Sequence, residues 1–373
     1  MAEKWDAWLS KAMPLKVGVI VDMGERVGGT FPLVCELVRQ RYLQSGRLGR
    51  DVEFIYKFPR GAPTGLIENA AKAYHELCDE GALIVVGFCQ GDNTIGVSPQ
   101  AEIRKVPLIT LAAPVNHLSE HVFCVPFGSI PEDALMCASW LAKQGCKKVT
   151  LTYDRMHHSR IYLDIFMAHA ARFGLKLMAA DRLPVLMGEE AEQAFRETVA
   201  AHRAMKPDGI VHMGTSDTAT VLARVVTESG WDVPRIMNFT FAYSEFPNYT
   251  AFYEGWVGTS MVDDANPTMQ RLLRDYAAAY PDKPPPQPEL VSIFHDGVTA
   301  ALEAVAMSSL YTPHGLKEGI EKVRMLPSAI GGSRNVISFG PHDHCGLRGA
   351  DLMVFRRVKN GQRIMEGYYQ SPD

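Results

Sequence analysis

The sequence predicts an α/β protein made of two successive units, each a parallel sheet flanked by helices. Short apolar runs alternate with amphipathic helical stretches through the first two thirds of the chain, which is typical of βαβ units whose sheet is covered on both faces. The turn-rich segment 126–131 divides this alternation into two series of about equal size. The length of 373 residues fits two domains, each able to bury its own core.

The first series contains four expected strands and three expected helices. The strands are expected at 16–22, 52–57, 82–88 and 107–111. The helices are expected at 31–44, 64–80 and 94–105.

The second series repeats the alternation. Its helices are expected at 132–144, 159–173, 189–204 and 219–229. Its strands are expected at 148–153, 176–183, 209–213 and 235–239.

The last third of the chain does not form another complete unit, and we expect it to extend the two units already built. A connector with five prolines, 281–288, is expected to be stiff and extended. The remaining helices are expected at 268–280, 290–309 and 315–323, and the remaining strands at 256–261, 335–339, 351–357 and 362–369.

Composition excludes several classes of function. With 38 Lys and Arg against 42 Asp and Glu, the formal net charge is -4, which does not suit nucleic acid or an anionic membrane surface. Runs such as 82–88 are strand-sized, so no membrane span is expected. The first eight residues hold two acidic groups and no apolar core, so they do not look like a secretory leader. We expect a cytoplasmic protein if the chain is complete, or a periplasmic one if a leader was removed.

The seven cysteines show no CxxC pair and no zinc spacing. Most are flanked by apolar residues, which favours buried, reduced thiols over a disulfide framework.

Two glycine-bearing turns follow strands and could contact a ligand. The turn 22–30 opens a helix, but its spacing is not GxGxxG and no acidic residue ends the second strand, so a dinucleotide cofactor is not expected. In the turn 87–94, small residues could expose backbone N–H groups to a bound carboxylate or amide. The same residues could equally form an ordinary helix N-cap.

Two histidine-bearing segments remain open in role. His157 and His158 follow a strand of the second series, where ligand contact or simple loop polarity suits them better than a metal. His342, His344 and Cys345 could bind a soft divalent ion, or form a polar turn. The sequence contains no motif in which a hydrolytic nucleophile and its general base stand at a characteristic spacing. We therefore expect neither catalytic residues nor a metal site.

The order of these elements resembles the type I periplasmic binding proteins, in particular the branched-chain amino-acid and amide-binding group of ABC-transporter substrate-binding proteins. The similar segments include KVGVIVD, ALIVVGFCQGDNT, KKVTLTYD, DGIVHMGTSD and IFHDGVTAALEAV. The resemblance implies the two-lobed Venus-flytrap fold, with a hinge of three crossovers near 121–127, 248–259 and 329–335. Lobe one would hold 15–122 plus 256–330, lobe two 123–255 plus 331–373, and 1–14 would be an N-terminal extension.

The resemblance also implies ten ligand-binding residues: Gly91, Asp92, Asn93, Ala113, Asn116, His158, Thr215, Ser216, Thr240 and Phe294. Thr240 stands near the position of the acid that receives an amino acid's ammonium group, unless the alignment slips to Glu245. Asp92 departs from the family pattern and would repel a carboxylate. Since a buried ammonium needs a carboxylate partner, an amide, a neutral or aromatic molecule or an organic acid suits the chain better than a zwitterion, unless Asp92 or Asp217 takes that role.

We therefore expect a non-enzymatic solute-binding protein that traps a small organic ligand between its lobes without a cofactor and delivers it to an ABC permease. The alternative is a cytoplasmic ligand sensor that controls a regulatory protein, as in the amide-binding group. An α/β enzyme is a third and weaker interpretation, because glycine turns at strand ends are common to both classes.

Overall fold

The computed structural model describes residues 13–22, 29–59, 66–113, 115–185, 189–214, 216–242 and 249–369. The chain forms two compact units. Unit 1 contains Met1–Phe127 and Ala265–Arg348, and unit 2 contains Gly128–Asp264 and Gly349–Asp373. The chain therefore passes from one unit to the other three times.

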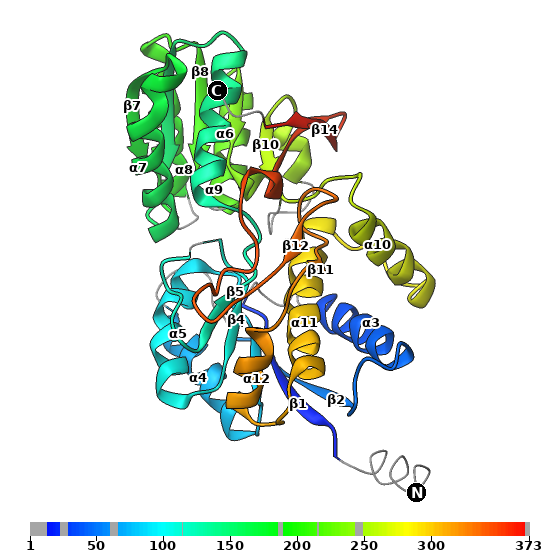
Figure 1. Ribbon diagram of the computed structural model, residues 1–373. Helices are drawn as coiled ribbons and strands as arrows, with labels where there is room; N and C mark the ends of the chain where they lie inside the picture. Colours follow the sequence, from blue (N-terminus) through cyan, green and yellow to red (C-terminus); the bar gives the residue numbers. More distant parts are fainter. Residues whose placement is uncertain are drawn as a thin grey trace, which may run out of the picture. The chain divides into compact units, whose positions relative to one another are not determined.

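Unit 1 is built on a five-stranded sheet of order β2-β1-β3-β4-β5, in which every pairing is parallel. Its strands are β1 Leu15–Ile20, β2 Val52–Lys57, β3 Ile84–Gly87, β4 Leu108–Thr110 and β5 Val122–Cys124. Its helices are α3 Phe31–Gln44, α4 Ile67–Asp79, α5 Gly91–Arg104, α10 Pro267–Ala279, α11 Pro288–Met307 and α12 Pro313–Ile320. Helices α4 and α5 pack together on one face, and α3, α11 and α12 cover the other (Figure 1).

Unit 2 is built on a seven-stranded sheet of order β14-β13-β10-β9-β8-β6-β7. Its strands are β6 Lys148–Tyr153, β7 Lys176–Arg182, β8 Gly209–Met213, β9 Arg235–Met237, β10 Val257–Ser260, β13 Val354–Lys359 and β14 Gln362–Tyr368. Its helices are α6 Ile130–Lys143, α7 His157–His169, α8 Glu189–Ala204 and α9 Ser216–Glu228. Helix α6 packs with α7, and α8 packs with α9. The predicted α/β class is confirmed.

The two units share one strand order, although no repeat is visible in the sequence. The first five strands of unit 2 lie in the order β7-β6-β8-β9-β10, which matches β2-β1-β3-β4-β5 of unit 1. In both sheets the order reverses between the first and third strands of the series. Ligands of open α/β sheets bind at the carboxyl ends of the strands beside such a reversal.

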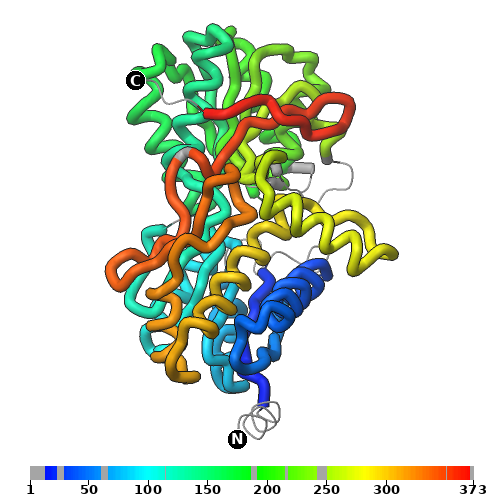
Figure 2. Tube along the Cα trace, turned by 45° about the vertical axis from the view of Figure 1, so that its right-hand side comes forward, coloured from blue at the N-terminus to red at the C-terminus, as the bar shows by residue number. Residues whose placement is uncertain are grey.

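Helix α11 is the central helix of unit 1 and lies beside α3, which is far from it in the sequence (Figure 2). By length and composition alone it is the one helix of the described residues that could cross a membrane, but 89% of its most apolar 18-residue stretch is buried, as in a core helix. Buried polar residues such as Asp296 and Glu303 keep the apolar runs within this helix short.

The predicted lobe boundaries differ from the two units in three segments. Residues 123–127, which include the end of β5, were placed in lobe two, but they belong to unit 1. Strand β10 was placed in lobe one, but it pairs with β9 and β13 in the sheet of unit 2. Residues 331–348 were placed in lobe two, but they belong to unit 1. There β12 Val336–Ile337 pairs with β11 Leu326–Pro327, and the chain after it forms a bridge to β5. The contacts that place β10 and residues 331–348 come from residues far away in the sequence, in β13 and at Cys124.

Candidate functional site

In unit 1, a buried aspartate joins the loops that follow β1 and β3. Asp22 lies two residues after β1 and is fully buried. Its carboxylate accepts hydrogen bonds from the backbone N of Cys89 at 2.8 Å, the backbone N of Gln90 at 3.2 Å and Nδ2 of Asn93 at 3.0 Å. Burial raises the pKa of Asp22, and these hydrogen bonds act in the opposite direction. Asp22 thus fixes the loop that precedes α5.

The same loop contains a backbone conformation that bulky residues rarely adopt. Phe88 has a φ of 63° and is fully buried. Its carbonyl accepts hydrogen bonds from the backbone N of Leu111 at 3.1 Å and from Oγ1 of Thr94 at 3.4 Å. Strained residues persist where the surrounding structure fixes them, and such places are often functional.

Three of the predicted ligand residues form the first turn of α5 beside this loop. Gly91 and Asn93 are buried, and the side-chain amide of Asn93 is bound to Asp22. The Oδ1 atom of Asp92 is buried and has no hydrogen-bond partner among the described residues. Since a buried acceptor without a partner is costly, Asp92 is suited to receive a donor from a bound molecule.

The other predicted residues of unit 1 lie in different surroundings. Ala113 is buried after β4, whereas Asn116 is exposed. Phe294 is in α11, has no exposed surface and stacks on Phe31 with ring centroids 3.9 Å apart. Phe294 therefore belongs to the core of unit 1.

In unit 2, an aspartate occupies the corresponding place after the first strand of the series. Asp154 follows β6 directly and is fully buried. Its Oδ1 atom accepts hydrogen bonds from the backbone N of Met156 at 3.0 Å and from Oγ of Ser159 at 2.6 Å. These contacts fix the start of α7, as Asp22 fixes the loop before α5.

A buried histidine lies next to Asp154. Nδ1 of His212 lies 3.0 Å from Oγ1 of Thr152, and its Nε2 atom has no hydrogen-bond partner among the described residues. Burial lowers the pKa of His212 to about 4, although the charge of Asp154 acts against this. A Cβ on Gly214 would lie 2.6 Å from Nε2 of His212 and 2.8 Å from Oδ2 of Asp154. Glycine at position 214 therefore allows the backbone to approach both groups.

Asn238 joins the ends of β8 and β9. Its Oδ1 atom accepts hydrogen bonds from Oγ1 of Thr240 at 2.8 Å and from the backbone N of Gly214 at 3.4 Å. Its Nδ2 atom donates to the backbone O of Gly214 at 3.4 Å. The predicted ligand residue Thr240 is thus buried and directs its hydroxyl to Asn238.

Three rings lie together at this end of the sheet. The ring centroids of His158, Tyr162 and Phe239 are 6.3–6.4 Å apart in each pair. Tyr162 Oη and the backbone N of Phe239 both donate to Oδ2 of Asp133, at 2.8 and 3.1 Å. Burial raises the pKa of Asp133 to about 6. The predicted ligand residue His158 is therefore part of an aromatic group fixed by a buried carboxyl.

Two of the ten predicted residues have no described side chain. Thr215 lies outside the described residues, as does the alternative acid Glu245, and only the backbone of Ser216, the first residue of α9, is described. Their contact with a ligand stays a prediction.

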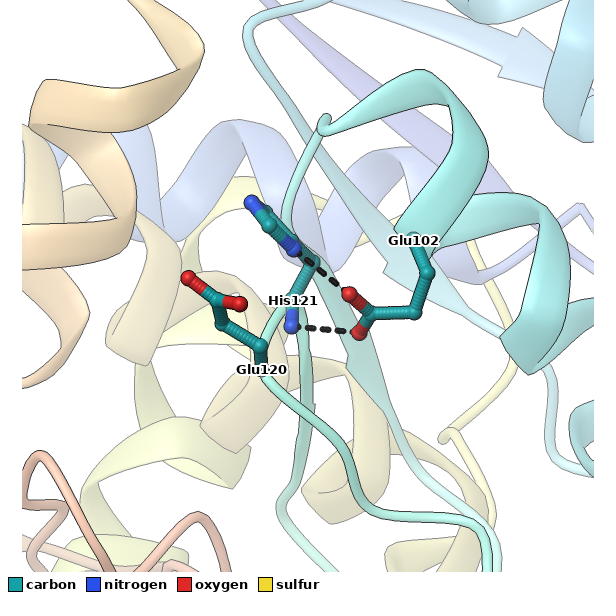
Figure 3. A group of neighbouring side chains, drawn as sticks. All are labelled: Glu102, Glu120 and His121. Carbon is teal, nitrogen blue, oxygen red and sulfur yellow. Dashed lines mark hydrogen bonds and ion pairs between the residues drawn. The ribbon is translucent and has the colours of Figure 1, made fainter.

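One group of potential metal ligands occurs among the described residues, and Figure 3 shows it. The ligand atoms of Glu102, Glu120 and His121 lie within 4.8 Å of one another. Glu102 already accepts hydrogen bonds from Ser119 Oγ at 2.5 Å and from the backbone N and Nδ1 of His121 at 2.7 and 2.8 Å. Burial raises the pKa of Glu102, but these bonds outweigh it and lower the pKa overall. The group serves to hold the turn before β5 against α5.

The potential metal-ligating side chains of the segment 342–345 do not point to a common position. Nδ1 of His344 lies 2.6 Å from the backbone O of Ser119, and its ring stacks on Phe123. Sγ of Cys345 donates to the backbone O of Leu347, and His342 is exposed. This segment offers no shared metal position.

The two aspartates that organise these loops were not predicted from the sequence. Asp22 lies two residues after β1 and Asp154 directly after β6, at the ends of the apolar segments KVGVIVD and KKVTLTYD. Comparison of the two series would have identified them as corresponding positions. His212 and Asn238 gave no signal, because their neighbours are brought together only by the sheet.

Comparisons with known proteins agree with this architecture. A family described as periplasmic binding protein matches residues 14–362. Similar solved structures include an ABC transporter substrate-binding protein from Desulfitobacterium hafniense in complex with leucine, at 19% identity and a TM-score of 0.77, covering 95% of this chain and 100% of that one. A leucine-binding protein, LivK, from Thermotoga maritima is 21% identical with a TM-score of 0.75, covering 95% and 98%. A solute-binding protein from R. palustris in complex with benzoate is 15% identical with a TM-score of 0.76, covering 95% and 96%.

No curated protein matches the chain. At these identities the solved structures show the fold, and the family match covers nearly the whole sequence. The family is described as periplasmic, which does not support the expectation of a cytoplasmic protein or the alternative of a cytoplasmic sensor. The chain belongs to the periplasmic binding protein family and has its type I fold.

Proposed function

We propose that this protein is a non-enzymatic solute-binding protein that holds a small organic molecule at the carboxyl ends of its parallel strands. The observation that carries the proposal is the shared strand order of the two units, with a fully buried aspartate after the first strand of each series. Each aspartate fixes the backbone of a neighbouring loop or helix start. Such rigid loops at the reversal point of a sheet are suited to binding.

The solute that we propose carries an N–H donor, as an amide or amine does. Asp92 Oδ1 is a buried acceptor without a partner among the described residues, at the start of α5. A donor from the solute would satisfy this atom, whereas a carboxylate would be repelled by it. Asp92 therefore favours an amide over an organic acid at the carboxyl ends of the strands in unit 1.

The residues at the carboxyl ends of the strands in unit 2 favour an apolar or aromatic part of the solute. His158 lies with Tyr162 and Phe239 in a group of three rings, and rings of this kind attract flat or apolar groups. Thr240 cannot replace the acid that receives an ammonium group, because its hydroxyl is bound to Asn238. An amino acid would need Asp92 or Asp217 for that role.

The natural solute can be identified by native mass spectrometry of the protein purified from its host without denaturant. We expect one small organic molecule per chain, with at least one N–H group, which is released on unfolding. A nicotinamide or flavin nucleotide as the retained species would contradict the proposal and favour an enzyme.

We also propose that the protein acts in the periplasm as the binding component of an ABC-type uptake system, since its relatives include ABC transporter substrate-binding proteins. Closure of the two lobes on the ligand stays a prediction. Small-angle scattering tests it: the radius of gyration should fall when the ligand saturates the protein, and an unchanged radius would exclude closure.

A further inference from the structure

Two of the seven cysteines face each other across a strand bridge at the edge of the unit 1 sheet. Cys124 ends β5 and forms a parallel bridge with Cys345. The backbone N of Cys124 donates to the backbone O of His344 at 2.8 Å, and the backbone N of Gly346 donates to the backbone O of Cys124 at 2.7 Å. Among the described residues, no other two cysteines are strand partners.

The geometry of this bridge suits a covalent bond between the two side chains. Neighbouring strands are about 4.8 Å apart, and disulfides join residues whose α-carbons are roughly 4.4–6.8 Å apart. Partners in register point to the same face of a sheet. Sγ of Cys124 donates to the backbone O of Ala112, and Sγ of Cys345 donates to the backbone O of Leu347, both at 3.2 Å. Side-chain rotation that gives up these two weak bonds would bring the sulfur atoms together.

We propose that Cys124 and Cys345 form a disulfide when the chain folds in an oxidising compartment. One cysteine thiolate attacks a disulfide donor such as oxidised glutathione, releases one thiol and forms a mixed disulfide. The second cysteine attacks this intermediate and releases the second thiol. The two protein thiols are oxidised, their two protons are lost, and the donor is reduced to two thiols.

Burial decides when this reaction can occur. Cys124 is fully buried and Cys345 is 5% exposed. Burial raises the pKa of the Cys124 thiol well above its ordinary value, which disfavours the reactive thiolate in the folded chain. Oxidation therefore takes place while residues 344–346 dock on β5, before the sulfur atoms are enclosed.

The two cysteines lie close to two of the points where the chain passes between the units. Cys124 is three residues before Phe127, and Cys345 is three residues before Arg348. Phe127 and Arg348 are the last residues of unit 1 before the first and third passages to unit 2. The disulfide would therefore tie two of the three connecting segments together within unit 1, and it would close a loop that contains all of 128–264. Long loops of this kind are where a cross-link constrains the unfolded chain most.

The test is to refold the full chain with reduced and oxidised glutathione, alkylate the remaining thiols in denaturant, and map the peptides without a reductant. We expect a linked pair of peptides containing Cys124 and Cys345, and a fall in alkylated thiols from seven to five. Seven alkylated thiols, or bonds scattered among other cysteines, would overturn the proposal. This map uses the native sequence and does not depend on any variant.

A thermal measurement gives an independent test. The oxidised protein should melt roughly 5–10 °C above the reduced one. Cys35→Ala, at a buried cysteine of α3 without a strand partner, should keep this difference, and Cys345→Ala should lose it. An equal difference in Cys345→Ala would show that other residues cause the shift and would contradict the proposed bond.

Discussion

The side-chain amide of Asn93 donates a 3.0 Å hydrogen bond to the fully buried carboxylate of Asp22, which lies 71 residues earlier in the chain. This bond joins the first turn of α5 to the end of β1, at the point where the strand order of unit 1 reverses. The proposed ligand site of this unit therefore depends on a residue that is not itself expected to contact the ligand.

We first predict that Asp22→Asn destabilises the protein by about 2–4 kcal/mol. Asn has one acceptor atom where Asp22 serves two backbone N–H groups and one amide, so buried donors lose their partners. Urea denaturation measures the free energy of unfolding. The matched control is Asp79→Asn, because the Asp79 side chain is 67% exposed and its pairing with Arg104 is worth little. Equal stability of the two variants would contradict the structural role of Asp22.

The second prediction concerns the close approach of β3 to β1. A Cβ on Gly87 would lie 2.5 Å from the backbone O of Ile20, and Gly87 has a φ of 150°. Gly87→Ala should lower the free energy of unfolding by about 2–4 kcal/mol. Gly145 has a φ of 82° but open space around its Cβ position, so Gly145→Ala should cost only about 1 kcal/mol. If both changes cost the same, the clash with Ile20 is not the cause.

The third prediction is a pH dependence of stability that arises from His212. Burial lowers its pKa to about 4 from an ordinary 6.5. Because the folded pKa is depressed, the neutral ring contributes stability that is present above pH 6.5 and is lost as the pH falls towards 4. The slope from this one group is at most about 1.4 kcal/mol per pH unit.

His212→Gln should reduce that loss of stability between pH 6.5 and 4. Part of it should remain, because burial also lowers the pKa of His117 to about 4. His314→Gln is the control, since the His314 side chain is 74% exposed. Chemical denaturation at several pH values measures the slopes. Identical slopes for the native protein and His212→Gln would show that His212 does not titrate in this range.

The fourth prediction concerns the ligand specificity of the proposed binding site in unit 1. Asp92→Asn should weaken binding of an amide and strengthen binding of the corresponding carboxylate, each by about 10-fold or more, because a charge-assisted hydrogen bond is lost and a repulsion is removed. Titration calorimetry with benzamide and benzoate measures both changes. Glu68→Gln, at an exposed acid in the first turn of α4, is the control and should change neither affinity. An unchanged preference in Asp92→Asn would remove Asp92 from the site.

The sequence was sufficient to predict the order of elements wherever periodicity is strong. The strand 52–57 and the helix 31–44 were predicted with the bounds that β2 and α3 have. Short segments with distant partners could not be placed in this way. The segment that includes β12 and Cys345 was assigned to the wrong unit, because its contact with the distant Cys124 forms only in the folded chain.

The candidate site was predictable to a similar extent. Polar residues after a strand, such as Asp92 and Asn93, can be recognised from the neighbouring sequence. The role of Asp22 could not, since its partners Cys89 and Gln90 contribute only backbone N–H groups that any sequence would supply. The burial of a residue could not be predicted from its sequence neighbours either. Phe294, one of the ten predicted ligand-binding residues, has no exposed surface and stacks on Phe31.

The central claim is that this chain binds a small organic solute with an N–H donor and does not transform it. The most direct measurement is titration calorimetry of the reduced, ligand-free protein with matched amides and carboxylates: benzamide and benzoate, leucinamide and leucine. We predict saturable binding of one molecule per chain, tighter for the amide of at least one pair, with the ligand recovered unchanged. Absence of saturable binding for all four compounds, tighter binding of the carboxylate in both pairs, or recovery of a hydrolysed amide would contradict the account.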